Sequence, residues 1–128
     1  MSNLEVTPDS KRTKAAITGC GGRGYEHARG YSASPEVDIV AVCDPDPAAL
    51  DRITAKFTIG ETFADHQSMF AAHNPDIVSV CTWTGLHPEH VLDSISAGVR
   101  AIHSEKPIAP TWGEAKMMVA IADAARVR

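Results

Sequence analysis

The sequence predicts an α/β fold in which one parallel sheet carries helices on both faces. Three observations support this prediction. Short apolar segments alternate with helical segments along the 128 residues, a glycine-rich turn follows the first apolar segment, and an acid ends the second. Strands that alternate with helices form parallel sheets through right-handed crossovers. We therefore expect a doubly wound sheet with strand order 3-2-1-4-5 and a ligand site beyond the carboxyl ends of its strands.

The first predicted strand, residues 15–18, runs directly into Gly19-Cys20-Gly21-Gly22-Arg23-Gly24, a GxGxxG pattern. Gly19 permits a tight turn, Gly21 lets a pyrophosphate approach the backbone, and Gly24 lets the next helix pack closely on the sheet. The helix predicted over residues 24–33, with Tyr25 and Ala28 on its buried side, offers unpaired N–H groups and a positive dipole end to a phosphate.

The second predicted strand, residues 37–43, ends at Asp44, twenty residues after Gly24. A carboxylate in this position can accept both hydroxyls of an adenosine ribose and would repel a 2′-phosphate. The combination predicts a Rossmann-type dinucleotide-binding sheet that prefers NAD to NADP. Two alternatives remain at this point. Glycine-rich turns also occur for purely conformational reasons, and methyltransferases place an acid at the end of the same strand.

Capping and periodicity predict the remaining elements. Asp46 and Pro47 begin a helix with Leu50, Ile53 and Phe57 on one face, and Asp65 caps another after a short edge strand at Thr62-Phe63. A buried strand at residues 77–81 comes next, followed by a helix that begins at about Pro88 and ends at Gly98. The last strand is predicted at residues 99–103. A capping box of Thr111 and Glu114 then begins the last helix, which has Ala115, Met118, Ala122 and Ala125 on one face.

Composition narrows the function. The net charge is −4 with no basic run, which argues against nucleic acid as the main partner, and no apolar run approaches the ~20 residues that span a bilayer. Cys20, Cys43 and Cys81 form no CxxC pair and are odd in number, which indicates a reducing, cytoplasmic setting and thiols that serve for packing. We expect residues 1–13 to form a flexible tail and residues 14–128 to form one domain.

Four ordered motifs make the chain resemble the N-terminal domain of the Gfo/Idh/MocA oxidoreductases, the family of glucose-fructose oxidoreductase and inositol dehydrogenase. The motifs are the glycine-rich turn followed by His27, Ala41-Val42-Cys43-Asp44-Pro45, Thr82-Trp83-Thr84-Gly85-Leu86-His87, and Ser104-Glu105-Lys106-Pro107 before an alanine-rich helix. The Glu-Lys-Pro triplet is the most specific of them, and it separates the chain from methyltransferases.

The resemblance implies hydride transfer between NAD and a sugar or polyol hydroxyl. Lys106 would be the catalytic residue, pointing at the carbon that exchanges hydride and bonding to the substrate oxygen as charge develops there. The family pattern also implies a set of cofactor-binding residues: Gly19, Gly21, Gly22, Arg23 and Gly24 at the pyrophosphate, Asp44 at the adenosine ribose, Thr82, Trp83 and His87 on the nicotinamide side, and Glu105 with Lys106 near the nicotinamide ribose.

Two residues leave the site open to interpretation. Trp83 stands where the family usually has proline, so its indole either stacks on the cofactor or partly fills the pocket. His87 fits equally well as a nicotinamide contact and as a first-turn residue of a helix. His87 and His90 are three residues apart, but no third ligand is in view, and we expect no metal.

Family members continue into a second α/β domain that forms the substrate pocket and the oligomer contact, and this domain is absent from the 128 residues. We therefore expect the chain to be a cofactor-binding domain with little or no turnover. A non-catalytic NAD(H)-binding or interaction module is the alternative function. The uncovered apolar surface would also favour association, including a homo-oligomer, or poor folding of the isolated chain.

Overall fold

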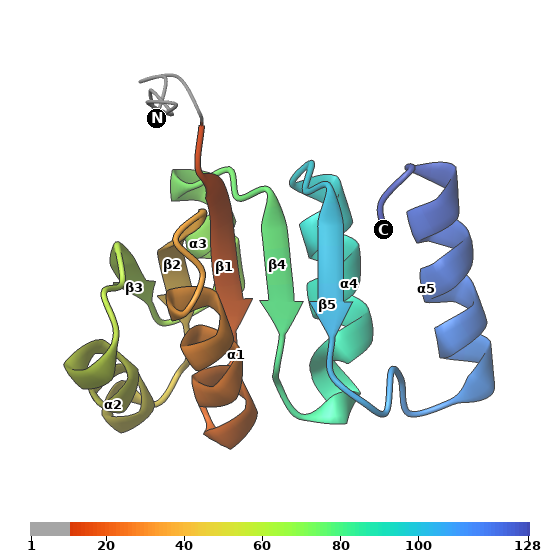
Figure 1. The fold of residues 1–128 in the computed structure, drawn as a ribbon. Helices are drawn as coiled ribbons and strands as arrows, with labels where there is room; N and C mark the ends of the chain where they lie inside the picture. The colour runs from red at the N-terminus through yellow and green to blue at the C-terminus, as the bar shows by residue number, and fades with distance from the viewer. Residues whose placement is uncertain (1–10) are drawn as a thin grey trace.

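A computed structural model describes residues 11–128 and shows a five-stranded parallel sheet in the order β3-β2-β1-β4-β5 (Figure 1). Most of the predicted tail, residues 1–10, lies outside the described residues, and β1 begins one residue before the predicted start of the domain. The elements in chain order are β1 (Thr13–Thr18), α1 (Gly22–Ser32), β2 (Val37–Cys43), α2 (Pro47–Lys56), β3 (Glu61–Phe63), α3 (His66–Ala72), β4 (Ile77–Val80), a 3₁₀ turn (Thr84–Leu86), α4 (His87–Ser96), β5 (Ala101–Ser104) and α5 (Trp112–Ala124).

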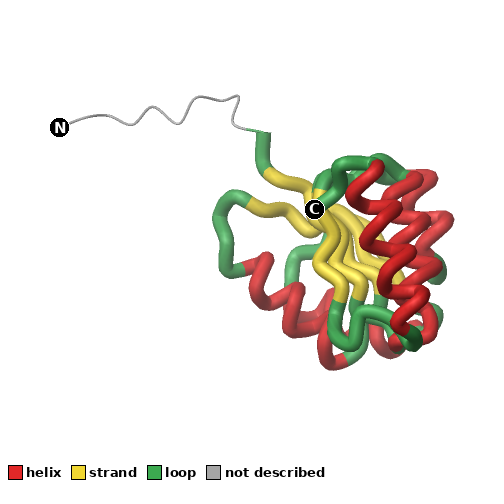
Figure 2. Tube along the Cα trace, turned by 90° about the vertical axis from the view of Figure 1, so that its right-hand side faces the viewer, coloured by secondary structure: helices red, strands yellow, loops and turns green. Residues whose placement is uncertain are grey.

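Helices cover both faces of the sheet, as Figure 2 shows. The face under α1 and α2 buries Ile17, Ala28, Ile39, Val42 and Ile53. The opposite face lies under α3, α4 and α5, and its buried side chains include Met69, Val78, Val80, Val91 and Met118. The central strands β1 and β4 are buried on both sides and mostly apolar there, because helices exclude water from both of their faces. The predicted doubly wound sheet is confirmed.

Caps account for where several helices begin. The side chain of Asp46 accepts a hydrogen bond from the N–H of Ala48 at 3.0 Å, with Pro47 as the first residue of α2. Asp65 accepts from the N–H of Ser68 at 2.7 Å at the start of α3. Both predicted caps are confirmed. Gly98 also has the predicted role, since its φ of +84° reverses the chain after α4.

Three predicted details differ from the structure. Helix α1 begins at Gly22, because Gly21 is the N-cap. The fifth strand begins at Ala101 instead of residue 99, because the N–H of Val99 still donates to a carbonyl of the α4 terminus. The capping box of α5 is only half formed. Thr111 Oγ1 accepts from the N–H of Glu114 at 3.2 Å, but among the described residues Glu114 Oε2 has no partner.

The last helix leaves much of its apolar surface uncovered. Met118 is buried against the sheet as predicted, whereas Ala125 lies beyond the end of α5 and is exposed. Trp112 is 78% exposed and Val119 50%. The backbone of the C-terminal residue, Arg128, pairs with β5. Its carbonyl accepts from the N–H of Ile102 at 2.7 Å, and its N–H donates to the carbonyl of Arg100 at 3.1 Å. The outer edge of β5 is therefore paired with the backbone of Arg128 in the pattern of a parallel ladder.

Gly24 and Gly30 of α1 form a matched pair for testing the close helix–sheet contact. A Cβ at position 24 would lie 1.9 Å from the carbonyl oxygen of Gly19, whereas a Cβ at position 30 would meet no atom within 4 Å. Gly24→Ala should therefore destabilise the domain by about 3 kcal/mol or more. Gly30→Ala should stabilise it by about 0.5–1 kcal/mol through helix propensity. Urea unfolding measures both changes, and equal stability of the two variants would contradict the packing of α1.

Candidate cofactor-binding site

The loops that follow β1, β2 and β4 meet around a cavity of about 530 Å³. The predicted site residues that line it are Gly19, Gly21, Asp44, Thr82 and Trp83. Each of them lies at or just beyond the carboxyl end of a strand, at the end to which the strand arrows point in Figure 1. The cavity thus occupies the crevice in which doubly wound sheets bind ligands, on either side of the first strand.

The glycines of the turn have three distinct surroundings. Gly19 has a φ of +87°, and a Cβ there would lie 2.7–2.8 Å from the backbone of Cys81 and Thr82. Gly24 lies against the Gly19 carbonyl. By contrast, a Cβ at Gly21 would meet nothing within 4 Å. Gly19 and Gly24 are therefore required by the protein's own packing, whereas Gly21 leaves open space beside the cavity for a ligand to approach the backbone.

The amino end of α1 carries unpaired backbone donors. Its N-cap is Gly21, which has no side chain to accept from them, and the first turn contains no acidic residue. The N–H of Tyr25 donates to the Gly21 carbonyl at 2.9 Å and closes the first turn, so the N–H groups before it have no carbonyl partner within the helix. These donors and the positive end of the helix dipole suit a phosphate group.

Two backbone donors hold the carboxylate of Asp44. Its Oδ2 accepts from the N–H of Cys20 at 2.8 Å, and its Oδ1 accepts from the N–H of Asp46 at 2.8 Å. The first bond joins the end of β2 to the glycine-rich turn. A carboxylate has about four lone-pair sites, so each oxygen of Asp44 keeps the capacity to accept a further hydroxyl hydrogen.

The connection between β4 and α4 forms another wall of the cavity. Trp83 is 65% exposed, and its ring covers Gly85, where a Cβ would lie 2.0–2.6 Å from ring atoms. His87 is the first residue of α4 and is buried. Its Nε2 lies 2.9 Å from the carbonyl oxygen of Thr82 and its Nδ1 3.2 Å from that of Ile108. Carbonyls thus face both ring nitrogens of His87, and a nicotinamide contact of this residue remains a prediction.

Two side chains of α1, those of His27 and Arg23, hold the carboxylate of Glu105, which does not line the cavity. His27 Nε2 lies 2.7 Å from Glu105 Oε1, and Arg23 donates to the same oxygen from Nε at 3.2 Å and from Nη2 at 3.0 Å. The hydrogen bond from His27 and then that from Arg23 lower the pKa of Glu105 from 4.5 to about 2. Glu105 is therefore a carboxylate at neutral pH, and Arg23 joins the glycine-rich turn to the loop after β5.

Lys106 follows Glu105 directly and is exposed, with a cis peptide bond to Pro107. Its backbone N–H donates to Glu105 Oε2 at 3.3 Å. Lys106 and Glu105 lie at the same sheet edge as the cavity but do not line it. The three cysteines have the predicted packing role, because burial raises the pKa of each thiol to about 12, which keeps it protonated.

Comparison with known proteins agrees with this geometry. The family model described as an oxidoreductase family with an NAD-binding Rossmann fold, Gfo/Idh/MocA, matches residues 13–128. The chain belongs to the Gfo/Idh/MocA family. Among the curated relatives of this Gfo/Idh/MocA domain, D-apiose dehydrogenase of Paraburkholderia graminis is 34% identical over 95% of the chain, and D-glucoside 3-dehydrogenase of Escherichia coli is 34% identical over 85%.

Solved structures support the same assignment. The WlbA dehydrogenase from Bordetella pertussis, in complex with NADH and UDP-GlcNAcA, matches with a TM-score of 0.83 and 32% identity over 92% of the chain and 35% of that protein. An oxidoreductase from Agrobacterium radiobacter in complex with NAD+, L-tartaric acid and magnesium matches with a TM-score of 0.85 and 27% identity over 91% of the chain and 34% of that protein. The chain spans about a third of the length of the curated relatives it matches, 32% and 31% of the two dehydrogenases named above.

The Gfo/Idh/MocA domain contains a polar chain that the sequence analysis did not identify. Tyr31 and His27 both contact the buried Ser79 hydroxyl, at 2.7 Å and 2.8 Å, and His103 packs on the His27 ring with centroids 4.4 Å apart. With a neutral imidazole, Ser79 donates to Nδ1 and Nε2–H donates to Glu105. The position of His27 eight residues after Gly19 was visible in the sequence, but its partners lie 52 and 78 residues away.

The lowered pKa of Glu105 predicts how the free energy of unfolding of this Gfo/Idh/MocA domain changes at acid pH. Ionised Glu105 contributes stability above pH 4.5, its ordinary pKa, and this contribution is lost as the pH falls toward about 2. The difference in free energy of unfolding between the wild type and Glu105→Gln should therefore shrink across this window. Glu36→Gln, an exposed carboxylate before β2, controls for the loss of one negative charge. A difference for Glu105→Gln that is constant between pH 5 and pH 2 (roughly) would contradict the contacts with His27 and Arg23.

Proposed function

We propose that the crevice binds NAD and that the chain serves as the cofactor domain of a sugar or polyol dehydrogenase. Membership of an NAD-binding oxidoreductase family supports this proposal, as do relatives that are dehydrogenases of D-apiose, D-glucosides and inositol. The observation that carries the assignment to a dinucleotide is the convergence of open space at Gly21, unpaired donors of α1 and the carboxylate of Asp44 on one cavity.

The cofactor should lie with its pyrophosphate at the turn and its adenosine ribose at Asp44. Backbone donors from Cys20 and Asp46 orient the Asp44 carboxylate, so little side-chain entropy is lost when it accepts the two ribose hydroxyls. A 2′-phosphate in the same place would bring two or nearly two negative charges against the carboxylate. We therefore propose NAD over NADP.

Calorimetric titration with NAD and NADP tests the role of Asp44. The wild type should bind NAD at least roughly tenfold more tightly than NADP, since each lost bond to a charged group costs about 1.5–3 kcal/mol. Asp44→Asn removes the charge and keeps one oxygen that can accept from the backbone. NAD binding should therefore weaken, and the ratio of the dissociation constants for NADP and NAD should become smaller. Asp46→Asn, at the adjacent helix cap, is the matched control and should keep the preference. Comparable dissociation constants of the wild type for NAD and NADP would contradict the proposal.

Lys106 is the residue we propose to contact the reacting carbon of the substrate. It follows β5 at the sheet edge that carries the glycine-rich turn, and its exposed side chain belongs to the Glu-Lys-Pro motif of the family. An ammonium there can bond to the substrate oxygen while hydride leaves or arrives, and proton transfer of this kind contributes typically 10²–10⁴-fold to a rate. The remaining substrate contacts would come from beyond the 128 residues, which span about a third of the relatives.

Turnover of a fusion protein separates the dehydrogenase function from a non-catalytic NAD(H)-binding module. The chain should bind NAD but show little or no change in nicotinamide absorbance with a panel of sugars and polyols, because most substrate positioning would lie outside it. Fusing a relative's second domain after Arg128 should restore turnover, and Lys106→Ala in that fusion should lower kcat by a larger factor than it weakens NAD binding. Substantial turnover by the isolated chain would contradict the proposed division of labour.

A non-catalytic NAD(H)-binding or interaction module is the second candidate. Exposed apolar side chains on two sides of α5, Trp112 with Val119 and Met117 with Ile121, favour it because they suit contact with another protein chain. This module would bind NAD with no substrate-dependent absorbance change even in the fusion, and Lys106→Ala would then have no measurable effect. The same surface supports self-association into a homo-oligomer.

The proposed partners and location follow from the same observations. A sugar or polyol is a small neutral substrate, in keeping with the acidic net charge of −4 and the absence of a basic run. Within residues 11–128, every helix is too short or too polar to cross a membrane. The three free, protonated thiols suit the reducing cytoplasm that we propose.

A further inference from the structure

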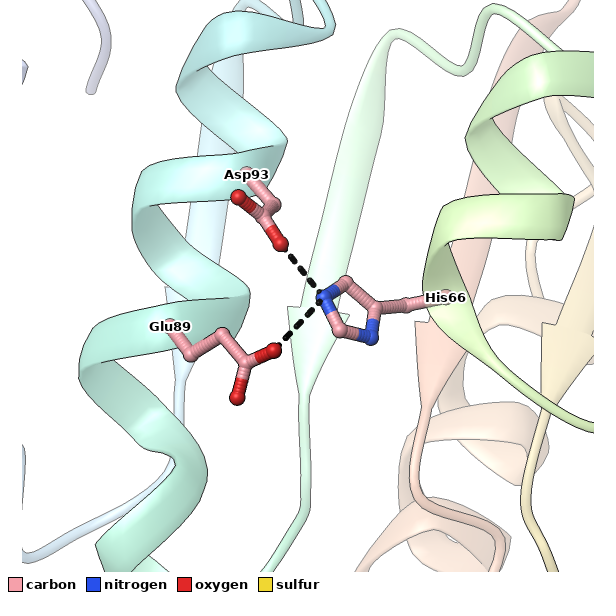
Figure 3. Close-up of side chains that lie close together, drawn as sticks. All are labelled: His66, Glu89 and Asp93. Atoms are coloured by element: carbon pink, nitrogen blue, oxygen red, sulfur yellow. Dashed lines mark hydrogen bonds and ion pairs between the residues drawn. The ribbon is translucent and has the colours of Figure 1, made fainter.

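Three side chains from α3 and α4 form a cluster that is separate from the residues assigned to NAD. His66 is the first residue of α3, and Glu89 and Asp93 lie one turn apart on α4. Figure 3 shows the His66 ring pointing between the two carboxylates. His66 Nε2 lies 2.7 Å from Asp93 Oδ2 and 3.9 Å from Glu89 Oε1, and the three atoms all lie within 4.8 Å of one another.

The buried side of this cluster has an unpaired nitrogen. His90 stacks on His66 with ring centroids 3.8 Å apart and an angle of 24° between the rings. His90 is only 7% exposed, and its buried Nδ1 has no hydrogen-bond partner in the described part of the chain. The His66 ring therefore packs on a buried neighbour that has an unpaired nitrogen.

Neighbouring groups hold the cluster in place. The Gln67 amide donates to Glu89 Oε1 at 3.3 Å, and stacking on His90 fixes the plane of the His66 ring. His66 itself is 5% exposed, whereas the side chains of Asp93 and Glu89 are 41% and 53% exposed. One ligand atom is thus rigid and buried, and the other two belong to side chains that are free to adjust from the solvent side.

We propose that His66, Glu89 and Asp93 bind one divalent transition-metal ion, with zinc as the best match. Zinc takes imidazole nitrogen and carboxylate oxygen at about 2.0–2.2 Å in tetrahedral geometry, which places ligand atoms about 3.4 Å apart. The His66 separations of 2.7 Å and 3.9 Å lie on either side of this value, so small rotations of the exposed carboxylates would complete three ligands. Water takes the fourth position. Mg²⁺ and Ca²⁺ fit less well because they prefer oxygen ligands alone.

The ion would lie in the wall of the crevice and join its two sides. His66 and Glu89 both line the cavity that contains Asp44 and Gly21, and the ion would hold α3 against α4 there. A metal ion binds the neutral form of an imidazole, and a divalent ion bound there would balance the two negative charges of Glu89 and Asp93. The proposal does not depend on hydride transfer or on NAD binding. Its alternative is a metal-free hydrogen bond between His66 and Asp93 that serves only to join the helices.

Zinc titration of the tag-free, chelator-treated protein distinguishes these readings. Calorimetry near neutral pH should give one zinc ion per chain. Glu89→Gln and Asp93→Asn should each weaken binding by at least roughly tenfold, since even outer-shell partners contribute 10–100-fold to metal affinity. Both substitutions keep the size of exposed side chains, and circular dichroism checks that they fold. His73→Gln is the matched control. Its His73–Glu61 pair, 2.9 Å apart, resembles the cluster but belongs to no group of three possible ligands among residues 11–128.

Cobalt(II) identifies the ligands independently. Substitution with cobalt should give visible d–d bands of a tetrahedral site and no near-ultraviolet charge-transfer band from a thiolate, because the cluster contains no cysteine. Zinc should also raise the melting temperature of the wild type and of His73→Gln, but not that of Asp93→Asn. The absence of saturable zinc binding, a thiolate band, or unchanged affinity in both carboxylate variants would overturn the proposal, whatever the outcome of NAD titration.

Discussion

The contact of the glycine-rich turn with the neighbouring strand ends is the constraint on which the site depends. Gly19 turns the chain against the backbone of Cys81 and Thr82, and Gly24 then lies on the Gly19 carbonyl. A side chain at either position would push α1 away from the sheet. Because α1 is held so closely, its unpaired N–H groups and the open space at Gly21 lie beside the same cavity. The same turn therefore lets α1 pack closely on the sheet and leaves room beside Gly21 for a phosphate.

Hydrogen bonds connect the glycine-rich turn and α1 to β4 and to the residues that follow β2 and β5. Asp44, after β2, bonds to the N–H of Cys20 within the turn. Glu105, after β5, bonds to Arg23 and His27 of α1, and His27 continues to Ser79 in β4. The loops after β2 and β5 are thus tied to the glycine-rich turn and to the helix that follows it. A buried polar chain of this kind has one satisfied arrangement, so it favours a single position of each loop.

The last helix and the edge of β5 form a second distinctive region of the domain. Apolar side chains such as Trp112 and Val119 have no cover, and the backbone of Arg128 already pairs with the strand beside it. Relatives about three times as long carry the same domain within a larger chain. The domain therefore combines the crevice at the strand ends with exposed apolar side chains of α5, and these lie on different parts of the fold.

The sequence by itself determined the fold class, the strand order and the location of the crevice. It did so because local signals were strong. These signals were the apolar strands, the helix caps at Asp46 and Asp65, and a GxGxxG turn that is followed by Asp44 twenty residues after Gly24. Only the tertiary structure decided which side chains meet across elements. His27 with Glu105 and Ser79, and His66 with Glu89 and Asp93, are brought together by the packing of helices, strands and loops 23 to 78 residues apart in sequence. No local periodicity encodes such pairs, because the distance between two helices depends on the shape of the whole core between them.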